Sequence, residues 1–372
     1  MGVREKDIPP ILLVVGARPN FMKIAPLYSE LERRGLPQLL LHTGQHYDEN
    51  MSKIFFDDLG LPEPDIFLGV GSGSHATQTA SIMVKFEEVC LEVKPSIVVV
   101  VGDVNSTLAC TIVAKKMNIP TAHVEAGLRS GDMKMPEEVN RILTDAVADI
   151  LLTPSIDGNE NLIREGRKEE DIFFVGNIMI DSLKYCLERS SENGIFEKLN
   201  IQKGEYGVLT LHRPSNVDNA SSMESILEAL MEIGKIIEIV FPMHPRTRKS
   251  MERMGLSNRL LGIPNIRIVE PLGYLEFISI VSNSRVVLTD SGGLQEETTF
   301  LKIPCITLRK TTERPITVTD GTNKIVGNKS DHIIEAFNES IKENYSHKDD
   351  LPLWDGSTAV RIADIIQRYL EG

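Results

Sequence analysis

The chain has 372 residues, of which 41% are hydrophobic and 25% charged, a composition that excludes a disordered or low-complexity protein. The length exceeds what one hydrophobic core usually supports and favours two domains of roughly 150 to 200 residues. The formal net charge of −13 at pH 7 argues against a general nucleic-acid binder, because phosphate backbones are bound by clustered Lys and Arg.

Short apolar runs alternate along the chain with polar or Gly-rich turns and with longer segments of helical periodicity. This pattern is typical of βα units on a parallel sheet. The first half predicts strands in ILLVV (11–15), LLLHT (39–43), IVVVV (97–101), TAHVE (121–125), ILLTP (150–154) and IFFVG (172–176). The second half predicts strands in GVLTL (207–211), IEIVF (237–241), IRIVE (266–270), VVLTD (286–290) and CITL (305–308).

Between the two sets, residues 190–207 lose the strand pattern and are rich in Gly, Asn and charge, which suits a linker. We therefore expect an α/β protein of two doubly wound Rossmann-like domains, residues 1–189 and 190–356, facing a central cleft. The apolar run at 11–15 is too short for a membrane span or a signal peptide, which predicts a cytoplasmic protein with no membrane partner. The cysteines are far apart and lack metal-ligand spacing, which predicts reduced thiols and no structural metal: Cys90, Cys110, Cys186 and Cys305.

Ser291, Gly292 and Gly293 follow a predicted strand and precede a helix. Paired glycines let the backbone approach a phosphate, and free N–H groups at a helix start bind anions. Glu297 in the next turn can accept hydrogen bonds from a ribose diol, although a first-turn glutamate also simply favours the helix dipole. There is no GxxxxGK[ST] motif and no strand-linked GxGxxG motif, which argues against a P-loop ATPase and a standard dinucleotide dehydrogenase.

Arg18 and Lys23 follow the predicted strand at 11–15. In the second half, cations after other predicted strands form a basic lining in an acidic protein: His212, Arg213, His244, Arg246, Arg248, Arg309 and Arg314. Arginine forks and lysine point charges suit a diphosphate, so the lining favours a nucleotide or another phosphorylated ligand. The alternative reading of each cation is ordinary solvated charge.

Carboxylates come from the first half, where Asp103 and Glu125 end predicted strands and Glu137 follows Pro136 at a predicted helix start. Neighbouring parallel strands lie about 5 Å apart, so such groups can share one pocket, and carboxylates held together separate their pKa values into an acid and a base. We expect Glu138 to be solvated or helix-capping. Arg129 and Arg141 are expected to orient the loop by pairing with acids.

Seven motifs together resemble the non-hydrolysing UDP-N-acetylglucosamine 2-epimerases, in order and over nearly the whole chain: GARPNFMKIAPL, TGQHYD, GDVNST, HVEAGLRSGD with PEEVNR, LHRPSNVDN, DSGGLQEE and TERP. The resemblance implies a fold like that of the two-domain B-type glycosyltransferases. In that fold, residues 357–372 form a C-terminal helix that crosses back to the first domain. It further implies a homodimer without a metal or nicotinamide cofactor.

The resemblance also implies reversible conversion of UDP-N-acetylglucosamine to UDP-N-acetylmannosamine, by anti elimination of UDP to 2-acetamidoglucal and re-addition. Asp103, Glu125 and Glu137 match the acid/base carboxylates, and which one takes the C2 proton stays open. Other positions match phosphate contacts and catalysis (Arg18, Lys23, His212), the diphosphate turn (Ser291, Gly292, Gly293), the ribose (Glu297), a further substrate contact (Arg314) and the uracil pocket (Leu272, Phe277). The alternatives are a hydrolysing 2-epimerase that releases free N-acetylmannosamine and UDP, and a retaining B-type glycosyltransferase or nucleotide-sugar binder.

Overall fold

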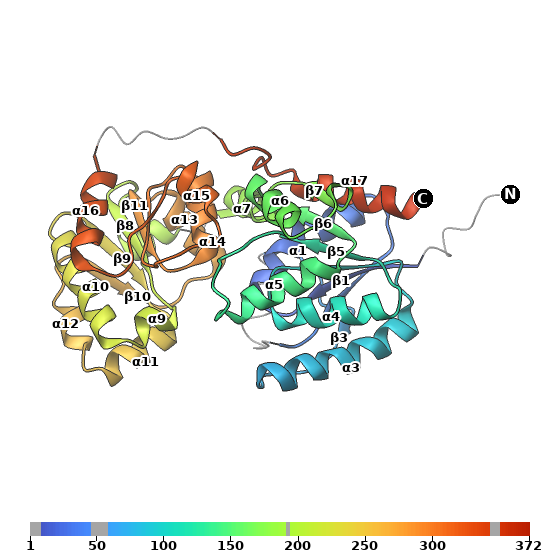
Figure 1. The fold of residues 1–372 in the computed structure, drawn as a ribbon. Coiled ribbons are helices and arrows are strands. Elements are labelled where there is room, and N and C mark those ends of the chain that lie inside the picture. Colours follow the sequence, from blue (N-terminus) through green and yellow to red (C-terminus); the bar gives the residue numbers. More distant parts are fainter. Residues whose placement is uncertain (1–8, 46–58, 191–193, 343–349) are drawn as a thin grey trace. The chain divides into compact units, whose positions relative to one another are not determined.

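The computed structural model describes residues 9–45, 59–190, 194–342 and 350–372. They divide into two compact units. Unit 1 contains the described residues up to Lys184 together with Pro352–Gly372, and unit 2 contains the described residues of Tyr185–Leu351. Each unit is built on one parallel β-sheet flanked by helices (Figure 1). The predicted fold class, an α/β protein of two doubly wound domains, is confirmed.

The sheet of unit 1 has seven strands in the order β3-β2-β1-β4-β5-β6-β7. The strands are β1 (Ile11–Val15), β2 (Gln38–His42), β3 (Ile66–Phe67), β4 (Ile97–Val101), β5 (Thr121–Val124), β6 (Ile150–Thr153) and β7 (Ile172–Phe174). The helices are α1 (Arg18–Arg33), α3 (His75–Val93), α4 (Asn105–Lys116), α5 (Pro136–Val147), α6 (Ile156–Arg164), α17 (Thr358–Glu371) and the 3₁₀ helix η1 (Glu169–Asp171). Helix α7 (Ile178–Ser190) begins in unit 1 and continues into unit 2 from Tyr185.

The central strands β1 and β4 are unbroken aliphatic runs because a doubly wound parallel sheet buries both of its faces. Every residue of these two strands is at most 3% exposed. Strands of this kind carry no polar face, so polar groups must come from positions just beyond their ends. The strand order changes direction between β1 and β4, and ligands of doubly wound sheets bind at the carboxyl ends beside such a change.

The sheet of unit 2 has six strands in the order β10-β9-β8-β11-β12-β13, and its direction changes between β8 and β11. The strands are β8 (Tyr206–Thr210), β9 (Glu238–Pro242), β10 (Ile266–Val269), β11 (Val286–Thr289), β12 (Cys305–Thr307) and β13 (Asn323–Ile325). The helices are α8 (Ile195–Leu199), α9 (Pro214–Val217), α10 (Ala220–Ile233), α11 (Pro245–Arg253), α12 (Ser257–Leu261), α13 (Tyr274–Ser282), α14 (Gly292–Phe300), α15 (Ile316–Thr319) and α16 (Ser330–Ser340).

All the strands expected from the sequence form, each with ends within two residues of the expected bounds. Strands β3 and β13 were not expected. Each lies at the edge of its sheet, and they contain only two and three residues, too few for an apolar run to stand out. The expected linker carries the short helix α8 before β8 begins.

Helix α17 belongs to unit 1, where it packs against α1. Its amide at Ala359 donates a 2.8 Å hydrogen bond to the carboxylate of Asp181, and Asp364 pairs at 2.7 Å with Arg34, the residue that follows α1. The buried residues of α17 include Ile362 and Ile366, which give the helix an apolar face toward the unit. The last helix of the chain therefore completes the first unit.

The expected reduced thiols are confirmed, because the four cysteines are buried and none forms a disulfide: Cys90, Cys110, Cys186 and Cys305. Among the described helices, none is both long enough and apolar enough to cross a membrane.

Candidate active site

A buried ion pair lies at the carboxyl ends of β1 and β5 in unit 1. Lys23 projects from the second turn of α1 and its Nζ contacts Oε2 of Glu125, the first residue after β5. Both side chains are buried. Glu125 has a φ of +70°, a backbone conformation that costs a non-glycine residue roughly 1–3 kcal/mol and that gathers at functional sites.

The second carboxylate oxygen of Glu125 is also buried, and the described residues supply it with no hydrogen-bond partner. An ionised carboxylate has only acceptor sites, so this oxygen is ready to accept a proton or a donor from a ligand. Gly102, the residue after β4, leaves room beside the ion pair because it has no side chain. A Cβ at this glycine would come within 3.2 Å of Lys23 Nζ and 3.7 Å of Glu125 Oε2.

Asp103 follows Gly102 and is the more accessible carboxylate, with 35% of its side chain exposed. Arg141 of α5 reaches it at 3.1 Å and pairs with Glu138 at 2.7 Å. Glu137 lies in the first turn of α5 and is partly buried. Lys23, Asp103 and Glu125 thus follow three neighbouring strands, while Glu137 comes from a helix that starts further along the chain.

The expectation that Glu138 is solvated was wrong, since it is only 1% exposed. Its carboxylate accepts hydrogen bonds from the amides of Ser130 and Gly131, both at 2.9 Å, and holds the loop before α5. Burial raises the pKa of Glu138, but these donors and Arg141 outweigh it and leave the pKa below its ordinary value. Arg129 and Arg141 pair with acids as expected, Arg129 with Glu165 at 2.6 Å.

A second buried cluster underlies the carboxylates. The ring of His123 donates from Nδ1 to Asp145 at 2.6 Å and from Nε2 to the carbonyl of Gly102 at 2.8 Å. Asp145 also accepts from the amide of Gly127 at 3.0 Å and pairs with Arg129 at 2.8 Å. Burial raises the pKa of Asp145, but His123 and Arg129 outweigh this effect and leave the pKa below its ordinary value. Sequence reasoning missed Asp145, because nothing in its helical context marks it as buried.

In unit 2, a histidine and an aspartate meet at the change in strand direction. His212 lies just after β8 and its Nδ1 is 2.9 Å from Oδ1 of Asp290, the residue after β11. Asp290 also accepts from the amides of His212, at 3.1 Å, and Arg213, at 3.0 Å. Burial raises the pKa of Asp290, but these donors bring it below its ordinary value. The sequence interpretation included the motif and overlooked this aspartate.

The predicted anion turn follows directly, with Ser291 as the N-cap of α14. Buried Glu313 lies against this turn and holds Arg314 at 2.7 Å and Arg309 at 2.9 Å, with Arg213 at 4.0 Å. Burial raises the pKa of Glu313, but Arg314 and Arg309 hold it well below its usual range. Arg314 also pairs with buried Glu296 at 2.8 Å, so three guanidinium groups face two carboxylates. The cluster keeps a net positive charge, which suits an anionic ligand.

The two glycines of this turn differ in the space around them. A Cβ at Gly292 would lie 2.6 Å from Oε1 of Glu313 and 2.9 Å from Nη1 of Arg314, whereas one at Gly293 meets nothing within 4 Å. We expect Gly292→Ala to lower the free energy of unfolding by about 1–3 kcal/mol, because the buried ion pair must shift. Gly293→Ala is the matched control and should be neutral or stabilising by up to about 1 kcal/mol. Urea unfolding of both variants measures this, and equal effects would contradict it.

Glu297 of α14 is buried beside Tyr274, whose hydroxyl donates to Oε1 at 2.8 Å. Burial raises the pKa of Glu297 from 4.5 to about 7, against the lowering effect of the tyrosine hydrogen bond. The carboxyl is thus half-protonated near neutral pH in the absence of ligand. The sequence interpretation assigned Glu297 but not Tyr274.

This raised pKa predicts a pH dependence of stability. Between pH 4.5 and about 7 the folded chain holds a proton on Glu297 that the unfolded chain has released. This carboxyl therefore makes the free energy of unfolding fall as pH rises through that window, by up to about 3 kcal/mol. The difference in stability between Glu297→Gln and the parent should grow in favour of the variant from pH 5 to pH 8. Urea titrations at several pH values test this, and parallel curves would contradict it.

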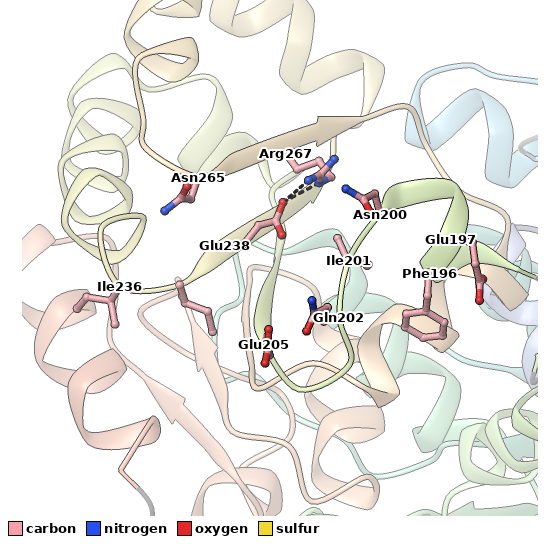
Figure 2. Close-up of a pocket in the computed structure, with 11 residues that line it drawn as sticks. Phe196, Glu197, Asn200, Ile201, Gln202, Glu205, Ile236, Glu238, Asn265 and Arg267 are labelled. Atoms are coloured by element: carbon pink, nitrogen blue, oxygen red, sulfur yellow. Dashed lines mark hydrogen bonds and ion pairs between the residues drawn. The ribbon is translucent and has the colours of Figure 1, made fainter.

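The carboxyl ends of β8, β9 and β10 carry a cavity of about 200 Å³ whose lining includes His212, Leu272 and Phe277. A larger cavity of about 710 Å³ lies at the amino ends of the same strands, and Figure 2 shows its lining. Glu238 and Arg267 pair there at 2.7 Å. Of the described site residues predicted from the sequence, none lines the larger cavity, and the carboxyl ends are where doubly wound sheets bind ligands.

The predicted site residues divide between the units. Unit 1 contains Lys23, Asp103, Glu125 and Glu137, and unit 2 contains His212, Leu272, Phe277, Ser291, Gly292, Gly293, Glu297 and Arg314. Arg18 begins α1, and its side chain lies outside the described part of the chain. Each group lies at the carboxyl end of its own sheet or on an adjoining loop or helix.

Comparison with known proteins agrees with this geometry. A family model described as UDP-N-acetylglucosamine 2-epimerase matches residues 29–367. A UDP-N-acetylglucosamine 2-epimerase homolog of Methanococcus maripaludis is 44% identical over 361 residues, which cover 96% of this chain and 99% of the relative. A UDP-2,3-diacetamido-2,3-dideoxy-D-glucuronate 2-epimerase of Pseudomonas aeruginosa is 42% identical over 363 residues, which cover 96% of this chain and 99% of the relative.

The crystal structure of the Methanocaldococcus jannaschii UDP-GlcNAc 2-epimerase in complex with UDP-GlcNAc and UDP is also similar. It superposes with a TM-score of 0.88 at 42% identity, covering 96% of this chain and 99% of that one. The match thus extends over both units. The chain belongs to the UDP-N-acetylglucosamine 2-epimerase family.

Proposed function

We propose that this protein interconverts UDP-N-acetylglucosamine and UDP-N-acetylmannosamine by eliminating UDP and adding it back. A carboxylate removes the C2 proton, and the electron pair of that bond becomes the C1–C2 double bond of 2-acetamidoglucal. The C1–O bond breaks at the same stage and its electron pair leaves with UDP. Protonation of C2 from the opposite face, with return of UDP to C1, gives the epimer. The atoms balance without an oxidant or reductant.

The observation that carries the proposal is the buried pair of Glu125 and Lys23. Proton transfer at carbon requires a base held free of competing donors, and one oxygen of Glu125 meets this condition among the described residues. Asp103, after the neighbouring strand, supplies a second carboxylate, and Glu137 a third. We assign these three groups the acid and base roles, and Lys23 and Arg18 contacts with the departing diphosphate.

Unit 2 supplies the groups that we assign to UDP. The turn of Ser291, Gly292 and Gly293, with Arg314 beside it, suits the diphosphate because amide donors and a guanidinium group converge there. We assign Glu297 to accept hydrogen bonds from the ribose diol, and the 200 Å³ cavity lined by Leu272 and Phe277 suits the uracil ring. His212 borders the same cavity and is assigned to the phosphates.

The decisive experiment is incubation with UDP-N-acetylglucosamine in deuterated water, followed by NMR. The proposal predicts UDP-N-acetylmannosamine that carries deuterium at C2, because the proton taken from C2 exchanges with solvent before re-addition. Abundant free N-acetylmannosamine would instead indicate a hydrolysing 2-epimerase. Unchanged substrate in the presence of folded protein would contradict the proposal.

A second candidate function shares the chemistry but changes the sugar. The Pseudomonas aeruginosa UDP-2,3-diacetamido-2,3-dideoxy-D-glucuronate 2-epimerase is 42% identical, about as similar as the archaeal relative at 44%. We therefore include that nucleotide sugar as a second substrate in the same assay. A much larger kcat/KM for it than for UDP-N-acetylglucosamine would move the assignment to the diacetamido uronate.

A further inference from the structure

The environment of His212 is set by one buried carboxylate. Asp290 is 0% exposed and contacts the histidine in two ways. Its Oδ1 accepts from the backbone amide of His212 at 3.1 Å and lies 2.9 Å from the ring Nδ1. Its Oδ2 accepts from the amide of Arg213 at 3.0 Å and from Nδ2 of Asn216 at 3.2 Å. The aspartate therefore fixes the backbone after β8 and the ring together.

The two ring nitrogens of His212 are consequently not equivalent. An ionised carboxylate only accepts hydrogen bonds, so Nδ1 must carry a hydrogen in order to bond Asp290. The other nitrogen, Nε2, has no partner among the described residues. The side chain is 44% exposed and borders the 200 Å³ cavity with Leu272 and Phe277. Only Nε2 is open to a ligand.

We propose that Asp290 is a positioning residue that keeps a hydrogen on Nδ1 of His212, so that the histidine acts on the nucleotide sugar through Nε2 alone. This inference rests on the proposed function, in which His212 contacts the phosphates. When the C1–O bond breaks, its electron pair stays on the departing β-phosphate oxygen. The ring donates a hydrogen bond from Nε2 to that oxygen, and the negative charge of Asp290 stabilises the imidazolium that does so. No proton has to leave the ring.

A purely structural role of Asp290 leads to a different expectation. Asparagine has nearly the same shape and keeps one carbonyl oxygen, which can still accept from the amides of His212 and Arg213. It also carries an NH₂ group, which cannot accept a hydrogen bond from Nδ1. Asp290→Asn therefore preserves most of the loop anchor while removing the acceptor for the ring.

The first test needs no turnover. Nitrogen-15 NMR of ¹⁵N-histidine-labelled full-length protein is recorded while pH is raised until the ring is neutral, with His212 assigned by the loss of its signals in His212→Ala. Deprotonation of the imidazolium then shows which nitrogen keeps its hydrogen and so distinguishes the two neutral tautomers. We expect the Nδ1–H form. The Nε2–H form would overturn the inference. This result does not depend on the substrate, so a protein inactive on nucleotide sugars would contradict the proposed function and leave the tautomer measurement intact.

The second test is a double-mutant cycle on turnover of UDP-N-acetylglucosamine. Asp290→Asn should lower kcat on the order of a hundredfold while the dissociation constant of UDP stays within about threefold. In the His212→Ala background, the same substitution should lower the residual rate by less than about twofold, because there is no ring to position. A hundredfold loss in both backgrounds would show that Asp290 acts independently of His212 and would overturn the inference.

Discussion

Glu125→Gln should lower the turnover of UDP-N-acetylglucosamine by about a thousandfold or more, while UDP binds within about threefold of the parent affinity. The amide keeps the size of the carboxylate but cannot take a proton from carbon, and it cannot neutralise Lys23. The residues assigned to UDP in unit 2 are unchanged by the substitution. Coupled-assay kinetics and UDP calorimetry on the same preparation measure the two quantities.

Glu30→Gln is a matched control for the loss of a partly buried carboxylate. Glu30 lies on the same helix as Lys23 and pairs with Arg34 at 2.7 Å, but it is near the other end of that helix from the strand ends. The Glu30→Gln variant should lose stability and retain turnover.

Asp103→Asn, by contrast, should bind UDP and turn over UDP-N-acetylglucosamine poorly. A near-normal rate in Asp103→Asn would remove Asp103 from the mechanism, and a near-normal rate in Glu125→Gln would refute the central assignment.

Glu313→Gln should lower the free energy of unfolding by about 3 kcal/mol, because it removes the carboxylate partner of buried Arg309 and leaves Arg314 with Glu296 alone. The lowered pKa of Glu313 adds a pH signature. Its ionised form stabilises the fold at pH values above the ordinary carboxyl pKa, and this contribution is lost as pH falls toward the lowered folded value. The stability difference between parent and variant should therefore be largest near neutral pH and shrink in acid.

Glu339→Gln provides the comparison for the same change at the surface of the same unit. Glu339 pairs with Lys324 at 2.7 Å and is 51% exposed, so its removal should change the free energy of unfolding far less than the removal of Glu313 does. Urea unfolding monitored by circular dichroism measures both variants. A Glu313→Gln variant that is as stable as Glu339→Gln would show that the arginine cluster is adequately solvated without its carboxylate.

Much of the fold could be predicted because burial on both faces of a parallel sheet leaves a plain mark in the sequence. Runs such as 11–15 and 97–101 are entirely aliphatic, so any catalytic or binding side chains had to lie in the polar turns that follow them. Glu125 and Ser291 were identifiable for this reason, because Glu125 directly follows β5 and Ser291 comes two residues after the end of β11. The edge strands lacked the mark because they are too short to alternate or to form a run.

The buried acids that support the site could not be predicted, because the sequence alone does not distinguish a buried aspartate or glutamate from a solvated one. Glu138, Asp145, Asp290 and Glu313 are all buried. Asp145 and Asp290 contact histidines 22 and 78 residues away, whereas Glu138 and Glu313 have arginine partners within four residues. Asp290 meets His212 only because β8 and β11 are neighbours in the sheet. Such contacts depend on strand order, which local periodicity does not contain.

The interruption of unit 1 by unit 2 has a consequence for biosynthesis. Every residue of unit 2 has been synthesised when translation passes Leu351, whereas unit 1 still lacks Pro352–Gly372. Domains fold as units, so the later half of the chain can reach its native state before the earlier half does. Until α17 emerges from the ribosome, the surface of α1 that it covers stays in water, so unit 1 can be completed only after the whole of unit 2 has been made.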